Sequence, residues 1–118
     1  MLVIEDNPTN LELMTYLLTA FGHHAISART GEEGIRLATE RPPDLILCDI
    51  HLPDINGFEI LTRLRGMDAL TRVPIVAVTA SAMAGDREDV LARGFDGYMS
   101  KPIVPETFVA DVERFLKA

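Results

Sequence analysis

The chain has 118 residues, which is enough for one domain with a single hydrophobic core, and we predict one domain over residues 1–118. Lys and Arg number 11 against 18 Asp and Glu, and the resulting net charge of −7 disfavours direct binding to nucleic acid. No apolar run is long enough to span a membrane and no signal-peptide pattern opens the chain, so we expect a cytoplasmic protein with no membrane partner. The single cysteine, Cys48, excludes an internal disulfide, and its apolar neighbours predict a buried thiol.

Five short segments are predicted as strands, and segments of helical period fill the gaps between them. The strands are expected at residues 2–5, 24–28, 45–49, 75–79 and 97–100. The first, third and fourth are apolar on successive residues, which is typical of central parallel strands that are covered on both faces. Because consecutive βα units join by right-handed crossovers, we predict an α/β fold with a doubly wound five-stranded parallel sheet in the order 2-1-3-4-5.

The predicted helices have their own start and stop signals. The first presents Leu11, Met14, Leu18 and Phe21 on one face, and Asn7 is its expected N-cap. The other signals are Thr30 with Glu33 as a capping box for the second helix, Asn56 as a cap for the third, Gly94 at the end of the fourth, and an apolar stripe of Phe108, Val112 and Phe115 in the last.

Three carboxylates are predicted to converge at one edge of this sheet. Glu5 and Asp6 end the first strand and Asp49 ends the third, and these two strands are neighbours in the predicted order. Ligands of such sheets bind at the carboxyl ends of strands where the order reverses, which is between these strands. Carboxylates that lie close together require a counter-charge, and an all-oxygen cluster suits Mg²⁺. A magnesium site is therefore expected.

Two further polar residues follow strands along the same edge. Thr79 ends the fourth strand, and Lys101 follows the fifth. A hydroxyl and an ammonium that face a magnesium-bound carboxylate can stabilise a phosphoryl group during its transfer. Asp49 is then the natural nucleophile, and its attack on phosphorus would give an aspartyl phosphate.

Four short motifs carry a resemblance to a known family. They are Glu-Asp-Asn-Pro-x-Asn from residue 5, Asp-Ile-His-Leu-Pro from residue 49, Thr-Ala from residue 79 and Lys-Pro from residue 101. Together they resemble the response regulator receiver family, whose CheY-like fold is flavodoxin-like, and the resemblance covers nearly the whole chain. It implies a phosphorelay protein that accepts a phosphoryl group from a histidine kinase or a histidine phosphotransfer protein.

The resemblance also implies roles for single residues. Asp49 would be the phosphoacceptor, Asp6 a direct Mg²⁺ ligand, Glu5 a ligand through water, and the His51 backbone carbonyl a further ligand. Two departures from the family pattern are mild: Glu5 replaces the more common Asp, and Leu52 replaces the more common Met. The remaining implied features are Thr79 and Lys101 as phosphate contacts and a cis peptide bond between Lys101 and Pro102.

The family further implies residues that tune or transmit the signal. His51 and Ser81 occupy positions that set how fast the aspartyl phosphate hydrolyses, although either residue can be an ordinary loop residue. Thr79 and Tyr98 would act as a switch that reshapes the fourth helix, fifth strand and fifth helix, the face that would control a partner protein.

Three other functions compete with a phosphorylated receiver. A flavodoxin-like cofactor module needs a loop that cradles phosphate after the first strand, and Glu5 and Asp6 would repel that phosphate. A phosphatase of the haloacid dehalogenase type generally has a second Asp two residues after the nucleophile, where this chain has His51. A degenerate receiver, which acts only by binding proteins, would have lost acidic or phosphate-contacting residues that are present here. We expect a stand-alone receiver or the receiver of a hybrid kinase, and no turnover enzyme.

Overall fold

The computed structural model of the chain describes residues 1–80 and 86–116. The five strands are β1 (Leu2–Ile4), β2 (Ile26–Ala28), β3 (Ile46–Asp49), β4 (Ile75–Thr79) and β5 (Gly97–Ser100). The helices are α1 (Pro8–Ala20), α2 (Gly31–Glu40), α3 (Gly57–Arg65), α4 (Asp86–Ala92) and α5 (Pro105–Glu113), with short 3₁₀ helices η1 (Asp68–Leu70) and η2 (Arg114–Leu116).

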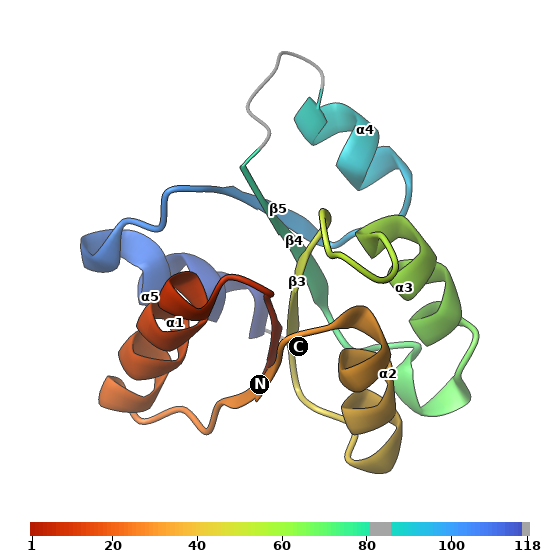
Figure 1. The fold of residues 1–118 in the computed structure, drawn as a ribbon, viewed down its shortest axis with the longest axis horizontal. Coiled ribbons are helices and arrows are strands. Elements are labelled where there is room, and N and C mark those ends of the chain that lie inside the picture. Colours follow the sequence, from red (N-terminus) through yellow and green to blue (C-terminus); the bar gives the residue numbers. More distant parts are fainter. Residues whose placement is uncertain (81–85, 117–118) are drawn as a thin grey trace.

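The strands form one parallel sheet in the order β2-β1-β3-β4-β5, which confirms the predicted topology. Each strand leads through a helix to the next parallel strand, as Figure 1 shows. The three strands predicted to be central, β1, β3 and β4, have every residue buried. Their continuous apolar runs therefore reflect a sheet that is covered on both faces.

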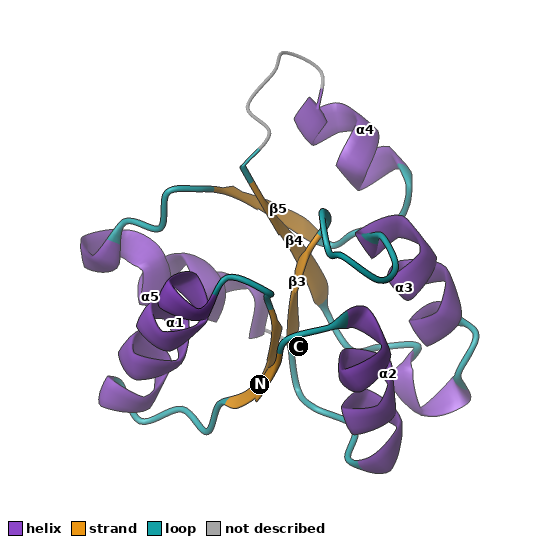
Figure 2. Ribbon diagram, viewed as in Figure 1, coloured by secondary structure: helices purple, strands orange, loops and turns teal. Residues whose placement is uncertain are grey.

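Helices cover both faces of the sheet and divide the core into two layers (Figure 2). Helices α1 and α5 lie on one face, and α2, α3 and α4 lie on the other. Because side chains alternate along a strand, Val3 and Leu47 pack in the α1–α5 layer, whereas Ile4 and Cys48 pack in the opposite layer. This arrangement leaves the carboxyl ends of the strands as the place where polar residues can gather.

Side-chain caps begin three of the helices, as predicted. Asn7, Thr30 and Asn56 each accept a hydrogen bond from the backbone N–H three residues later, at 2.9–3.1 Å. The capping box at Thr30 differs in one respect from the prediction. The Glu33 carboxylate accepts the N–H of Arg29 at 2.8 Å, one residue before the cap, because the chain turns before the helix begins.

The apolar stripe predicted for α1 is wrong at its last member. Leu11, Met14 and Leu18 are buried, but Phe21 is 65% exposed, and Leu17 is the additional buried residue. The helix ends at Ala20, so Phe21 leaves the helical path and its ring does not continue the stripe. A periodic pattern predicts which face is buried only while the helix continues.

The ends of α4 and α5 agree with the prediction. Gly94 has a φ of 116°, a left-handed conformation that favours glycine, and it lies two residues after the last residue of α4. Phe108 and Val112 of α5 are buried, and Phe115 packs against the same core. Phe115 belongs to η2, so the apolar stripe extends past the end of α5.

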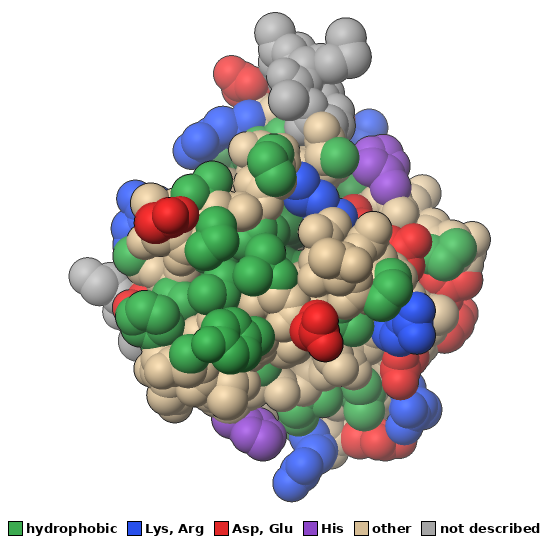
Figure 3. Space-filling view, turned by 60° about the vertical axis from the view of Figure 1, so that its left-hand side comes forward, with side chains coloured by type: hydrophobic (Ala, Val, Ile, Leu, Met, Phe, Trp, Pro, Cys, Tyr) green, Lys and Arg blue, Asp and Glu red, His purple; other side chains and the backbone are tan. Residues whose placement is uncertain are grey.

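Hydrophobic side chains are also exposed on the side of the molecule where α1 and α5 lie (Figure 3). The large ones are Tyr16 at 68%, Phe21 at 65% and Val104 at 50% exposure. Within the described residues, no helix is both long and apolar enough to cross a membrane. These side chains lie outside the core, which therefore does not account for them.

Candidate functional site

The structure brings three carboxylates together at the carboxyl ends of β1 and β3. Glu5 and Asp6 directly follow β1, and Asp49 is the last residue of the adjacent strand β3. One oxygen from each of Glu5, Asp6 and Asp49 lies within 4.8 Å of the others. Glu5 is 1% exposed and Asp49 is 4% exposed, so two of the three acids are held away from water.

Backbone N–H groups fix one oxygen of each buried acid. Oε2 of Glu5 accepts the N–H of Asn7 at 3.0 Å, and Oδ1 of Asp49 accepts the N–H of His51 at 3.0 Å. Both donors lie two residues after the acid, where the chain turns out of the strand. The turns therefore orient the carboxylates and leave their second oxygens facing the centre of the site.

Lys101 lies between these second oxygens. Its Nζ is 2.7 Å from Oε1 of Glu5 and 3.0 Å from Oδ2 of Asp49. The end of β4 holds the backbone of Lys101 in position, because the Lys101 N–H donates to the carbonyl of Thr79 at 2.9 Å. The peptide bond between Lys101 and Pro102 is cis, as predicted.

The charged groups of the site alter one another's protonation. Burial raises the pKa of Glu5, the Lys101 ammonium opposes that rise, and the Asp49 charge adds to it. Burial lowers the pKa of Lys101, but its contacts with Glu5 and Asp49 outweigh this effect and raise it. Lys101 therefore remains cationic, and Glu5 lies in an environment that favours an additional positive charge.

The donor set fits a divalent cation that prefers oxygen ligands. Three carboxylates face one ammonium, so the site has more negative charge than Lys101 can balance. Oε1 of Glu5 is buried, and the Lys101 ammonium at 2.7 Å is the partner that the described residues offer it. A hard cation such as Mg²⁺ would balance the excess negative charge with the oxygen ligands that it prefers. Glu5, Asp6 and Asp49 are the residues that could hold it.

The other residues predicted to act here are placed as follows. Thr79 is the last residue of β4 and is 1% exposed. Tyr98 is half-buried in β5 opposite Ala77 and packs against the α2–α4 layer of the core. His51 is exposed in the loop that follows β3, whereas Ser81 lies outside the described residues. The roles predicted for these residues remain predictions.

Cys48 adjoins the phosphoacceptor candidate but is not part of the site. Its thiol is fully buried and donates to the backbone carbonyl of Asp49 at 3.3 Å. Burial raises the pKa of this thiol far above its usual range, and the charges of Asp49 and Glu5 add to the rise. The thiol therefore stays neutral, in agreement with the structural role predicted for it.

Sequence reasoning missed Asp54, which links the loop after β3 to α2. Its Oδ1 accepts the N–H of Gly31 and its Oδ2 accepts the N–H of Glu32, both at 2.9 Å. The partners are 22 and 23 residues away, so no local pattern indicates the contact. An Asp in a loop rich in turn residues predicts only a local turn.

Comparison with known proteins identifies the family. The response regulator receiver domain matches residues 1–113, which is nearly the whole chain. The chain belongs to the response regulator receiver family. As a receiver it is similar to the polar-differentiation response regulator DivK of Brucella anthropi, with 41% identity over 98% of this chain and 94% of that protein.

Solved structures of other receivers have the same fold. The receiver domain of the sensor histidine kinase PA1611 from Pseudomonas aeruginosa is 32% identical, with a TM-score of 0.89 over 99% of this chain and 96% of that one. That structure has a magnesium ion coordinated in its active site cleft. The chemotaxis response regulator CheY4 of Vibrio cholerae has a TM-score of 0.90 at 24% identity, covers 97% of this chain and 95% of its own, and supports the fold alone.

Proposed function

We propose that this receiver accepts a phosphoryl group on Asp49, from a histidine kinase or a histidine phosphotransfer protein, in a reaction that requires Mg²⁺. The observation that carries the proposal is the position of Asp49. Its carboxylate ends β3 beside two other acids, and Lys101 Nζ lies 3.0 Å from Oδ2. The magnesium-bound receiver domain of PA1611 supports the choice of metal.

In this proposal each residue of the site has a separate task. An oxygen of Asp49 attacks phosphorus, the bond from phosphorus to the donor imidazole nitrogen breaks, and that nitrogen keeps the electron pair. Lys101 supplies a positive charge and Thr79 a hydroxyl for the oxygens of the transferred group. Glu5, Asp6 and Asp49, with the His51 carbonyl, would hold Mg²⁺, and the ion would offset the negative charge that gathers as the phosphoryl group arrives.

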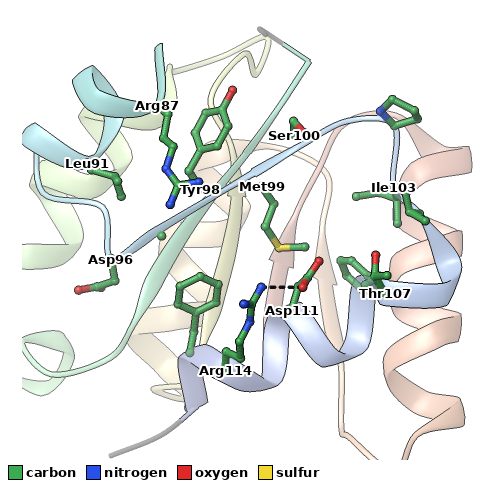
Figure 4. Close-up of a pocket in the computed structure, with 15 residues that line it drawn as sticks. Arg87, Leu91, Asp96, Tyr98, Met99, Ser100, Ile103, Thr107, Asp111 and Arg114 are labelled. Carbon is green, nitrogen blue, oxygen red and sulfur yellow. Dashed lines mark hydrogen bonds and ion pairs between the residues drawn. The ribbon is translucent and has the colours of Figure 1, made fainter. Parts of the chain in front are cut away.

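The output of the receiver would come from the face formed by α4, β5 and α5. A cavity of about 540 Å³ opens there, and Leu91 of α4, Met99 of β5 and Thr107 of α5 are among the residues that line it (Figure 4). Tyr98 of β5 also lines this cavity, and β5 pairs with β4, the strand that ends at Thr79. Phosphorylation would bias this face through Thr79 and Tyr98, and a downstream protein would bind it.

Several finer assignments belong to the same proposal. His51 and Ser81 would adjust the lifetime of the aspartyl phosphate by a modest factor. The receiver would catalyse its own phosphorylation and slow dephosphorylation without acting as a turnover enzyme, and it would work in the cytoplasm. The 41% identity with DivK supports a stand-alone receiver, and the 32% identity with the receiver domain of the sensor histidine kinase PA1611 supports the alternative, the receiver of a hybrid kinase.

A transfer experiment distinguishes this function from its competitors. A histidine phosphotransfer protein with labelled phosphohistidine is mixed with the receiver or with its Asp49→Ala variant, with and without Mg²⁺. We expect the label to move to the receiver in at most a one-to-one ratio, only with Mg²⁺ and only with Asp49 present. Repeated hydrolysis of a small phosphoester would indicate a phosphatase instead, and absence of transfer from any donor would support a protein-binding module.

A further inference from the structure

The loop between β3 and α3, residues 50–56, is anchored on the first turn of α2. Both oxygens of Asp54 are used there: one accepts the N–H of Gly31 and the other accepts the N–H of Glu32, at 2.9 Å each. Charged acceptors at a helix N-terminus form strong hydrogen bonds and interact favourably with the helix dipole. Asp54 itself is exposed, so burial does not force it to find these partners.

The residue after Asp54 strengthens the anchor by packing. A Cβ atom added to Gly31 would lie 2.4 Å from Cγ1 of Ile55 and 2.9 Å from Cδ1 of Ile60. Ile55 therefore occupies space that only a glycine on α2 leaves open. Two adjacent loop residues, one polar and one apolar, thus bind the same helical turn.

The two ends of the loop are also fixed. The Ile50 carbonyl accepts the N–H of Gly57 at 2.8 Å, and the His51 N–H donates to Oδ1 of Asp49 at 3.0 Å. Between these fixed points lies the His51 carbonyl, which the family resemblance assigns to Mg²⁺. The contact with α2 attaches the loop at Asp54 and Ile55, between its two fixed ends.

The first turn of α2 does not need Asp54 as its cap. Thr30 already caps the helix, with Oγ1 accepting the N–H of Glu33 at 3.1 Å. The N–H of Glu32 also belongs to the first turn, and Glu32 is exposed, so water can satisfy this group. Desolvation raises the pKa of Asp54, but backbone hydrogen bonds, those from Glu32 and Gly31 first, outweigh this effect and lower it. The carboxylate therefore stays ionised on the helix end at neutral pH.

We infer that Asp54 is a positioning residue of the phosphoacceptor site, which holds the β3–α3 loop on α2 so that the loop backbone keeps the geometry that Mg²⁺ binding requires. The inference rests on the proposed function and deepens it. Its physical basis is the same as for other groups that orient metal ligands from outside the coordination sphere. Asp54 acts through the backbone of the loop and does not contact the metal or the phosphoryl group.

The test compares Asp54→Ala with Thr30→Ala, which removes a hydrogen bond from the same helix end but keeps the Gly31 and Glu32 N–H groups that Asp54 binds. Mg²⁺ affinity is measured by calorimetric titration, and the phosphorylation rate is measured against acetyl phosphate concentration. We expect Asp54→Ala to raise the Kd for Mg²⁺ by about three- to tenfold, below the range for direct second-sphere partners because one more backbone step intervenes. The rate in saturating Mg²⁺ should recover most of the wild-type value. Thr30→Ala should leave the Kd unchanged.

Asp54→Asn keeps one acceptor oxygen and serves as the conservative variant, which also keeps the test decisive if Asp54→Ala does not fold. It should give an intermediate Kd. Equal Mg²⁺ affinity in the wild type, Asp54→Asn and Asp54→Ala would overturn the positioning role while leaving the proposed function intact. A wild-type protein that neither binds Mg²⁺ nor becomes phosphorylated would overturn the proposed function itself, so the two failures are distinguishable.

Discussion

Replacing Lys101 with Met is expected to destabilise the metal-free receiver by about 2 kcal/mol and to slow phosphorylation severely. The ammonium lies 2.7 Å from Glu5 and 3.0 Å from Asp49, and its removal leaves two buried carboxylates without their cation. Breaking a fully buried pair costs more, but the Lys101 side chain is 14% exposed, and solvent reduces the loss. Methionine has a similar length and no charge, so packing is largely kept.

Denaturant unfolding with and without Mg²⁺ measures this effect. The loss should shrink in saturating Mg²⁺, because the cation replaces part of the missing charge. Lys101 has a pKa raised above its usual 10.5, so its contribution to stability is fully present below pH 10.5 and is lost as the pH rises through the folded-state value. Arg36→Met is the control, since Arg36 forms an exposed ion pair with Glu40 and its loss should change stability little. A stability loss that Mg²⁺ leaves unaltered would contradict this account.

Replacing Gly57 with Ala is expected to damage the site and the fold together. The added Cβ would lie 2.8 Å from Cα of Ile50 and 3.1 Å from the carbonyl oxygen of Asp49, which are backbone atoms that cannot rotate away. Either α3 or the end of β3 must move, at a cost of about 2 kcal/mol, as in other overpacked cores. The shift displaces Asp49 relative to Glu5 and Lys101, so we expect the phosphorylation rate to fall by about tenfold or more, because small displacements of reacting groups are costly.

Gly66→Ala is the matched control at the other end of α3. A Cβ there would lie 3.5 Å from the nearest atom, and the φ of −75° suits any residue. Its stability should stay the same or rise by about 0.5 kcal/mol, because alanine restricts the unfolded chain. Unfolding curves and phosphorylation rates of both variants provide the comparison. If Gly57→Ala behaved like Gly66→Ala, the end of β3 would not be as tightly packed as the structure indicates.

Most of the fold follows from local features of the sequence. Successive apolar residues predicted β1, β3 and β4 as central strands, and β4 and β5 have the predicted bounds. Strand β1 ends one residue earlier than predicted. Strand β2 begins two residues later than predicted, and β3 begins one residue later. Strand ends depend on hydrogen bonds to neighbouring strands, which the residue pattern does not contain.

The candidate site was predicted in composition but only partly in geometry. Strand order places Glu5, Asp6 and Asp49 at one edge, because polar residues at the ends of adjacent strands must meet. Lys101 pairs with Glu5 as well as with Asp49. The sequence could not predict this double contact, because it depends on the conformation of a flexible side chain. The contact of Asp54 with α2 depends on the packing of a loop against a distant helix, and the chain carries no local signal for it.

The central claim, that Asp49 accepts a phosphoryl group with the help of Mg²⁺, is tested most directly by intact mass spectrometry. The wild type and the Asp49→Asn variant are incubated with acetyl phosphate, with and without Mg²⁺. We predict one phosphoryl adduct per chain in the wild type with Mg²⁺, and none without the metal or in the variant. An adduct that persists in Asp49→Asn, or a wild type that gains no adduct at all, would contradict this assignment.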